Sequence, residues 1–325
     1  MISPYRRRAL RAAAVMLSSA LFCLPVTGAA AQPVDGVGAA HAELPDPSGY
    51  DAAIVWLPDT QYYSESYPGH FNAQTRWIVD NADTRKLVYA THTGDIVDDH
   101  LVDRQWQNAS SSMGVLEAAG FPYGVAAGNH DVALFGAIFV DYRYFQRHFG
   151  ADRFAGSPVY GESYQNNRQH YDLVDVAGTE VLVLHLAWAM RTGDFDWAAQ
   201  VLTAHPNTPV IIAVHEYIDT NGAYSGQGGQ IFTRLVQPHD NVVAVIAGHI
   251  HGTATNVKDL GGGRQVVEML ADYQSGPEGG SAYLRLLQFD LDQNKLIVDT
   301  YSPSLDESNY FGDKDDFTVN LDLTP

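Results

Sequence analysis

The stretch LVYATHTGDIVDD at residues 87–99 decides the fold, because an apolar run passes directly into a glycine and three carboxylates. Residues 87–90 have the character of a buried strand, and Gly94 and Asp95 follow where that strand would end. The glycine lets the backbone turn sharply and approach a bound group without a clash at Cβ. Since ligands gather at the carboxyl ends of strands in open α/β sheets, this stretch predicts a polar site at a sheet edge.

Four other polar clusters follow apolar runs in the same way. They are Asp59-Thr60-Gln61 after residues 53–57, Gly128-Asn129-His130-Asp131 after 123–126, His215-Glu216 after 210–214, and Gly248-His249-Ile250-His251 after 242–247. Each cluster alone is a weak signal, since Gly-Asp is usually a turn and His-x-His is often a solvated pair on a strand. All five clusters in this order, each at a predicted strand end, favour one shared crevice.

The order of predicted elements indicates the fold class. Helical patterns alternate with short apolar runs, which include 181–186, and the helices are expected at residues 71–81, 103–119, 195–204 and 229–237. This alternation predicts α/β layering with short crossovers. The C-terminal part lacks helices between its strands, which are expected at residues 253–258, 265–270, 282–289 and 295–300. These four strands predict a second, more antiparallel sheet.

The residue types in the clusters are those of a transition-metal site. Mixed oxygen and imidazole ligands suit Mn, Fe, Zn or Ni rather than Mg or Ca alone. In extended backbone, residues two apart point to the same side, so Asp59 pairs with Gln61 and His249 pairs with His251. A carboxylate such as Asp95 can bridge two cations, which lie about 3.5 to 4 Å apart in two-metal hydrolases.

The series Asp-x-Gln, Gly-Asp-x-x-Asp, Gly-Asn-His-Asp, Val-His and Gly-His-x-His, spanning residues 59–251, resembles the calcineurin-like metallophosphoesterase superfamily. The resemblance implies a four-layer α/β/β/α sandwich with two divalent or mixed-valence metal ions, Mn, Fe or Zn, between strand ends. It implies that one metal is held by Asp59, Gln61 and His251, the other by Asn129, His215 and His249, and that Asp95 bridges them. The implied substrate is a phosphate mono- or diester, hydrolysed by a hydroxide that the two metals activate.

The resemblance also implies a proton donor and shows where this chain departs from its relatives. His130 would protonate the leaving oxygen, and Asp98 would orient its ring. Gln61 stands where the superfamily usually has histidine, and Asp98 stands where the purple acid phosphatase branch has tyrosine, so an iron(III)–tyrosinate site is not expected. Asp99 replaces an arginine of the Ser/Thr phosphatase branch, which makes a phosphoprotein a less favoured substrate.

A catalytically silent module that binds metal or a phosphorylated glycan on the same fold is the alternative. Such a protein should have lost key residues, whereas Asp95, Asn129, His130 and His249 are all present. Other polar positions are interpreted as packing. His92 and His185 lie in predicted strands, and packing is favoured over substrate contact for the loop at 272–274, which could rim the crevice.

The N-terminus has the pattern of an export signal. Residues 1–31 combine arginines at 6–8 and 11, an apolar stretch at 12–24 and a small-residue end, Ala29-Ala30-Ala31. Both the Sec and the twin-arginine routes fit, and the apolar stretch is shorter than a spanning helix needs, so a secreted or periplasmic protein without a membrane span is expected. Residues 32–48 are expected to be a flexible linker, and residues 49–325 one catalytic domain.

The charge of the mature chain limits its partners. The full chain has a formal charge of -19, and loss of four arginines with the signal gives -19 - 4 = -23. A surface this acidic repels polyanions, so nonspecific binding to nucleic acid is not expected. The only cysteine, Cys23, lies inside the signal, so disulfides are not expected either.

Overall fold

The computed structural model describes residues 44–135 and 139–323. The predicted export signal and most of the predicted linker lie outside these residues. The chain is already packed at Leu44, which contacts a core cluster, and a 3₁₀ turn follows at Pro47–Gly49. Packed structure is therefore present before the predicted boundary at residue 49. Among the described residues, no helix has both the length and the apolar character needed to cross a membrane.

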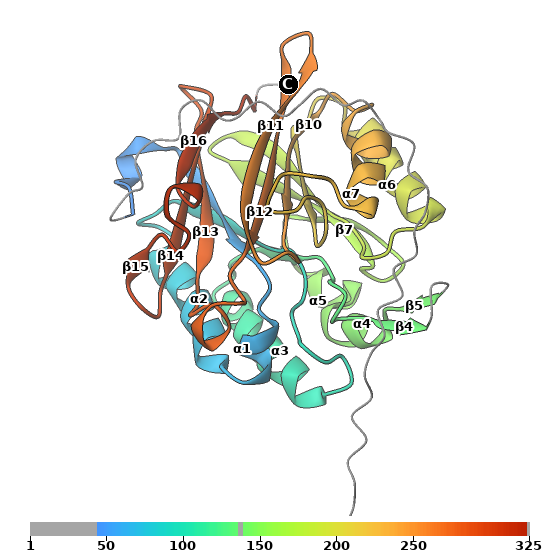
Figure 1. The fold of residues 1–325 in the computed structure, drawn as a ribbon, viewed down its shortest axis with the longest axis vertical. Helices are drawn as coiled ribbons and strands as arrows, with labels where there is room; N and C mark the ends of the chain where they lie inside the picture. Colours follow the sequence, from blue (N-terminus) through green and yellow to red (C-terminus); the bar gives the residue numbers. More distant parts are fainter. Residues whose placement is uncertain (1–43, 136–138, 324–325) are drawn as a thin grey trace, which may run out of the picture. The chain divides into compact units, whose positions relative to one another are not determined.

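Two seven-stranded sheets form the centre of the fold (Figure 1). The first sheet has the order β15-β14-β13-β1-β2-β3, and β16 also pairs with β14. Strands β1, β2 and β3 are parallel, while β13 to β16 are antiparallel to their neighbours. The bounds are β1 Ala52–Leu57, β2 Leu87–His92, β3 Tyr123–Val125, β13 Leu284–Asp290, β14 Lys295–Ser302, β15 Glu307–Ser308 and β16 Phe317–Asn320.

The second sheet has the order β11-β12-β10-β9-β8-β7-β6. Its four central strands, β12, β10, β9 and β8, are parallel, and the outer strands are antiparallel. The bounds are β6 Tyr160–Tyr164, β7 Gln169–Val176, β8 Thr179–His185, β9 Val210–Val214, β10 Val242–Ala247, β11 Gly252–Gly261 and β12 Arg264–Asp272. A separate small hairpin consists of β4 Ala133–Phe135 and β5 Phe139–Asp141.

The prediction of a separate C-terminal sheet was wrong. All four predicted strands exist, but β11 and β12 extend the second sheet beside β10, whereas β13 and β14 extend the first sheet beside β1. A sequence pattern predicts that a strand exists but not which strand it pairs with. Here β13 pairs with β1, which is far away in the chain.

Helices cover the outer face of each sheet (Figure 1). The first sheet carries α1 Gln61–Glu65, α2 Pro68–Asn81, α3 Asp103–Ala118, α4 Arg143–Phe149 and α5 Ala151–Phe154. The second sheet carries α6 Thr192–Ala204 and α7 Gly226–Ile231, and α7 continues into a π-helical turn at Phe232–Val236. All four predicted helices are present, with ends within a few residues of those expected.

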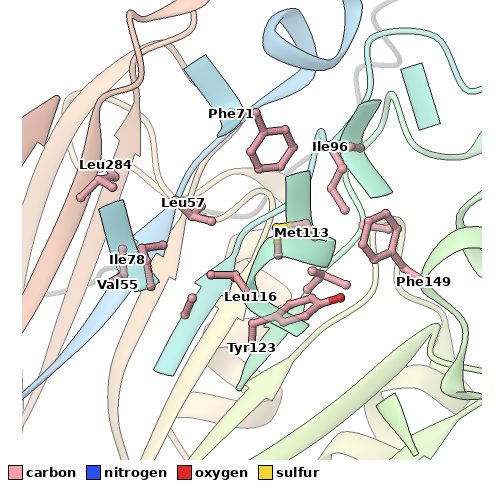
Figure 2. Close-up of a cluster of buried hydrophobic side chains, with 14 of the residues drawn as sticks. Val55, Leu57, Phe71, Ile78, Ile96, Met113, Leu116, Tyr123, Phe149 and Leu284 are labelled. Atoms are coloured by element: carbon pink, nitrogen blue, oxygen red, sulfur yellow. The ribbon is translucent and has the colours of Figure 1, made fainter. Parts of the chain in front are cut away.

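Three core clusters correspond to the three interfaces of a four-layer fold. One lies between the first sheet and its helices, one between the two sheets, and one between the second sheet and α6 and α7. Figure 2 shows the first of these, with Val55 and Leu57 of β1 near Ile78 of α2 and Met113 and Leu116 of α3. The predicted α/β/β/α sandwich is confirmed.

The continuous apolar runs follow from this layering. Along β1, Ala53, Val55 and Leu57 face the helices, while the alternate residues Ile54 and Trp56 face the second sheet. Both faces of such a strand are buried, so the sequence shows no alternation of polar and apolar residues.

Candidate metal centre

All five polar clusters follow the carboxyl ends of strands, as predicted. Three of them follow β1, β2 and β3 of the first sheet, and two follow β9 and β10 of the second. They meet across the space between the sheets, because His215 Nε2, after β9, lies 3.3 Å from Asp95 Oδ2, after β2.

A compact group of possible ligand atoms lies at this meeting point. One atom from each of Asp95, His215 and His249 falls within 4.8 Å of the others. His249 Nδ1 is 3.1 Å from His215 Nε2, and Asn129 Oδ1 is 2.9 Å from that same nitrogen. Two imidazole nitrogens, an amide oxygen and a carboxylate directed at one another form a donor set that suits a transition metal.

Contacts with neighbouring residues hold the imidazole rings of His215 and His249 in place. The backbone carbonyl of Thr93 lies 3.1 Å from His215 Nδ1 and can only accept, so Nδ1 donates to it, and Nε2 is directed at Asp95. Trp188 packs against both rings, with centroid distances of 5.4 Å to His215 and 5.3 Å to His249. Burial, followed by the neighbouring His215, lowers the pKa of His249 to about 4, so this ring is neutral and able to coordinate.

Asp59 provides the test of whether a cation fits here. Its Oδ1 accepts a hydrogen bond from His249 N at 3.0 Å, but its Oδ2 is buried and has no hydrogen-bond partner within the described chain. Burial, reinforced by Asp272 and Asp95, raises the pKa of Asp59 well above its usual value. A buried carboxylate oxygen without a hydrogen bond, near the further buried carboxylates of Asp95 and Asp272, is costly unless a cation compensates the charge, so the residues fit a metal centre.

Gln61 reaches the cluster by a different route from the predicted one. Asp59 has a left-handed backbone with φ of 40°, and Gln61 is the first residue of α1, so the predicted extended Asp-x-Gln segment was wrong. The side-chain amide of Gln61 nevertheless lies 3.3 Å from Asp95 Oδ2. A tight turn into a helix brings both side chains to the same buried point, which strand geometry alone does not capture.

The amide of Gln61 is held by a residue that was predicted only as possible packing. Gln274 Oε1 is in direct contact with the Gln61 amide. Gln274 is itself fixed by Asp272, whose two carboxylate oxygens accept from Gln274 N at 2.8 Å and from Gln274 Nε2 at 2.9 Å. Gln274 Oε1 thereby fixes the position of the Gln61 amide, whose oxygen is the atom that could bind a cation.

His251 lies at the rim of the cluster. The predicted extended backbone was wrong here too, since His249 has φ of 73° and neither histidine lies in a strand. Half of the His251 side chain is exposed, and its Nε2 is 3.8 Å from Asp272 Oδ2. It is the predicted ligand least enclosed by the site.

His130 has the setting of a proton donor, with one correction to its orienting group. Its Nδ1 lies 2.6 Å from the backbone carbonyl oxygen of Asp98, whereas the Asp98 carboxylate is 3.5 Å away. The main chain of Asp98, more than its side chain, therefore orients the ring. His130 Nε2 lies 4.0 Å from Asp95 Oδ2, and its side chain is 37% exposed, so a substrate can reach it.

Asp131 has a structural role that the sequence motif did not reveal. Its carboxylate is fully buried and accepts from the backbone N–H groups of Ile96, Val97 and Gly128 at 2.8 to 3.0 Å. It thereby ties the loop after β2 to the loop after β3. In the sequence, Asp131 is visible only as an acidic residue within a motif typical of metal sites. That position does not tell whether the carboxylate binds a metal or connects two loops.

Two glycines allow the close approach that the sequence predicted. A Cβ at Gly248 would lie 1.9 Å from Asp59 Oδ2, and a Cβ at Gly128 would lie 2.1 Å from Asp95 Oδ1. These contacts are with buried side chains that cannot move aside. Glycine is therefore needed at positions 248 and 128 because the metal centre leaves no room for a Cβ atom, and not because of the backbone angle.

Gly248→Ala is expected to reduce metal content and to lower turnover by about 10²-fold, because displacement of Asp59 misplaces the ligands. Gly156→Ala is the matched control, since a Cβ there meets nothing within 4 Å. Elemental analysis and turnover of both variants check this. Normal metal content in Gly248→Ala would contradict the steric account.

The fold and this ligand set define a class of protein, the metal-dependent phosphoesterases with two packed sheets. The sequence model of the calcineurin-like phosphoesterase family matches residues 52–253, and the chain belongs to this family. The predicted resemblance is thereby confirmed.

Relatives of the chain support the same fold. It is 48% identical over 283 residues to YvnB of Bacillus subtilis (strain 168), an uncharacterized protein, and the match covers 84% of this chain but only 22% of YvnB. A purple acid phosphatase from yellow lupin (Lupinus luteus) seeds is similar with a TM-score of 0.55, 15% identity, and coverage of 83% of this chain and 54% of that one. GAP50, the anchor in the inner membrane complex of Plasmodium, has a TM-score of 0.51, 12% identity, and coverage of 84% and 89%.

Proposed function

We propose that this chain hydrolyses phosphate esters at a centre of two divalent or mixed-valence ions of Mn, Fe or Zn. The observation that carries the proposal is the buried group of Asp95, His215 and His249 beside the unpartnered oxygen of Asp59. In this proposal one ion is held by Asp59, Gln61 and His251, the other by Asn129, His215 and His249, and Asp95 contacts both.

The ions supply Lewis-acid activation of water and compensation for charge on the phosphoryl oxygens. The chain's own residues do the rest. Thr93 and Trp188 hold the ring of His215, so its Nε2 keeps one direction. His130, with its Nδ1 proton donated to the Asp98 carbonyl, presents Nε2 toward the site, where it can deliver a proton to the leaving oxygen.

A preference for diesters over monoesters follows from the charge around His130. Asp98 Oδ1 and Asp95 Oδ2 lie 3.5 and 4.0 Å from the two ring nitrogens of His130. Burial raises the pKa of Asp98, His130 opposes this, and Glu65, Asp95 and Asp99 add to it. A monoester dianion brings one more negative charge to this rim than a diester does. Like charges oppose binding, so we infer that the diester is the better substrate.

Turnover of bis-p-nitrophenyl phosphate with added Mn²⁺, compared with p-nitrophenyl phosphate, tests the proposal. We expect a higher kcat/KM for the diester. A preference for the monoester would overturn the inference about substrate class but not the enzyme activity. Bound metal without turnover of either ester would support the silent binding module.

Gln274→Ala is expected to weaken the ion held by Asp59, Gln61 and His251 by about 10-fold, because Gln61 loses the group that orients its amide. The other ion should remain bound. Metal titration followed by calorimetry checks this, with the exposed Gln230→Ala on α7 as control. Equal weakening of both ions would show that Gln274 does not act through Gln61.

We also propose that the protein works outside the cytoplasm, on the basis of the basic, apolar and small-residue pattern of residues 1–31. Fractionation of expressing cells tests this proposal. Replacing Arg6 and Arg7 by lysine should block export if the twin-arginine route is used and should leave export intact if the Sec route is used. Unaltered protein found only in the cytoplasm, with residues 1–31 still attached, would contradict both routes.

A further inference from the structure

A second cluster of metal-type ligands lies between the two sheets, apart from the centre described above. It consists of His170 and Asp172 on β7, His185 on β8 and Tyr89 on β2. Each of these four side chains is at most 1% exposed. The family-level activity and the proposed function use none of them.

The strand register brings the three ligands of the second sheet together. His170 and His185 are direct partners in the antiparallel β7–β8 pair, so their side chains leave the same face. Asp172 follows His170 by two residues and therefore points to that face as well. Tyr89 reaches the group from the first sheet and donates a hydrogen bond to Asp172 Oδ2.

The ligand atoms lie close enough together to share an ion, and His185 Nε2 also lies 3.0 Å from Tyr89 Oη. His170 Nε2 lies 3.4 Å from Asp172 Oδ2, and His185 Nε2 lies 3.8 Å from the same oxygen. A charge-assisted N–H···O bond is shorter, about 2.7 to 2.9 Å. Two ligand atoms that are each about 2.1 Å from a tetrahedral zinc ion are separated by about 3.4 Å.

The hydrogen bonds of the cluster are incomplete. Both ring nitrogens of His170 and Oδ1 of Asp172 are buried and have no hydrogen-bond partner within the described chain. Unpartnered polar atoms in a dry interior are costly, and the carboxylate needs a positive charge beside it. Burial, followed by the neighbouring His170, lowers the pKa of His185 well below its usual value, so its ring is neutral there.

Gly124 of β3 adds an independent observation. A Cβ at this position would lie 2.2 Å from Tyr89 Oη, 2.4 Å from Asp172 Oδ2 and 2.5 Å from His185 Nε2. The backbone angle of Gly124 is not one that requires glycine. Strand β3 therefore has no side chain at the point where the first sheet contacts these polar atoms.

We propose that His170, Asp172 and His185, with the Tyr89 hydroxyl beside them, bind a structural zinc ion that ties the two sheets together. Two imidazoles and a carboxylate are a ligand set that zinc accepts, and the oxygen of Tyr89 is placed as a fourth partner. The two rings stack with centroids 4.3 Å apart, so binding turns each ring about its Cβ–Cγ bond to aim its lone pair at the ion.

A chelator experiment on the full chain tests this proposal. The protein is loaded with zinc, dialysed against EDTA, and analysed for metal per chain while circular dichroism monitors its fold. We expect one zinc ion to remain, because all four side chains of the cluster are buried and release of the ion requires local opening. Folded protein that retains no zinc, or that refolds fully in EDTA with unchanged melting temperature, would overturn the proposal in favour of a proton shared within the cluster.

Variants assign the retained ion to its ligands. His170→Gln and His185→Gln should lose the EDTA-resistant zinc, whereas His148→Gln, which removes an imidazole stacked on Trp106, should keep it. The double variant Asp95→Asn with His249→Gln should also keep it, since these residues belong to the other centre. Zinc retained in His170→Gln and His185→Gln but lost from the double variant would place the ion at the proposed active site instead and contradict the second site.

Discussion

Asp95→Asn is expected to remove both ions of the metal centre and to lower turnover by about 10³-fold or more, since the electrostatic work of such a site depends on its metals. Asp95 Oδ2 lies 3.3 Å from the side-chain amide of Gln61 and 3.3 Å from His215 Nε2, which belong to the two proposed ligand sets. Its Oδ1 also accepts from His130 N at 2.9 Å. Asparagine keeps the size of the side chain but removes the charge that two cations share.

Elemental analysis and turnover of the same sample measure this effect. Asp175→Asn is the control, because Asp175 is exposed and accepts from Gly178 N in a turn, a contact that asparagine can also make. It should keep full metal content and turnover. If Asp95→Asn retains both ions and turns over normally, Asp95 does not bridge them.

His130→Ala is expected to lose about 10²-fold or more in turnover of alkyl phosphate esters and much less with p-nitrophenyl esters, with both metals retained. An alkyl alcohol leaves with a pKa of about 15 and needs a proton, whereas p-nitrophenol, with a pKa of about 7, needs little help. The ring is partly exposed and held by the Asp98 carbonyl at 2.6 Å, so it is both accessible and oriented.

The slope of log rate against leaving-group pKa distinguishes the possible roles of His130. A steeper slope in the variant than in the wild-type protein supports proton donation. Parallel slopes would mean that His130 serves the metals or the phosphoryl oxygens. Because the backbone of Asp98 is the closer partner, Asp98→Asn should change the slope less than His130→Ala does.

The sequence revealed the layered fold because burial on both faces of a central strand leaves a continuous apolar run. This is why β1 and β9 were predicted nearly to their ends. The pairing of β11 to β14 could not be predicted, since the sequence of a strand does not specify which strand it pairs with. The elements β4 to β6, β15, β16, α1, α4 and α5 were missed because their patterns are brief, and the longer strand β7 was missed as well.

The ligand clusters could be predicted from their places at strand ends, but the backbone between paired ligands could not. Asp59, Asp95 and His249 all adopt positive φ, so a periodicity argument based on extended chain fails at the site itself. Gln274 and Asp131 were not assigned their roles, because an amide that orients another amide and a carboxylate that ties two loops have no distinctive spacing. Whether each predicted ligand binds metal stays a prediction.

The most direct test of the central claim is turnover of bis-p-nitrophenyl phosphate by protein whose metal-centre ions have been stripped, with the loss verified by elemental analysis. We expect no turnover in the stripped protein, a lower melting temperature, and recovery of both when Mn²⁺ is added, because ions that bind only the native state also stabilise it. Full turnover by the stripped protein would contradict metal-dependent hydrolysis.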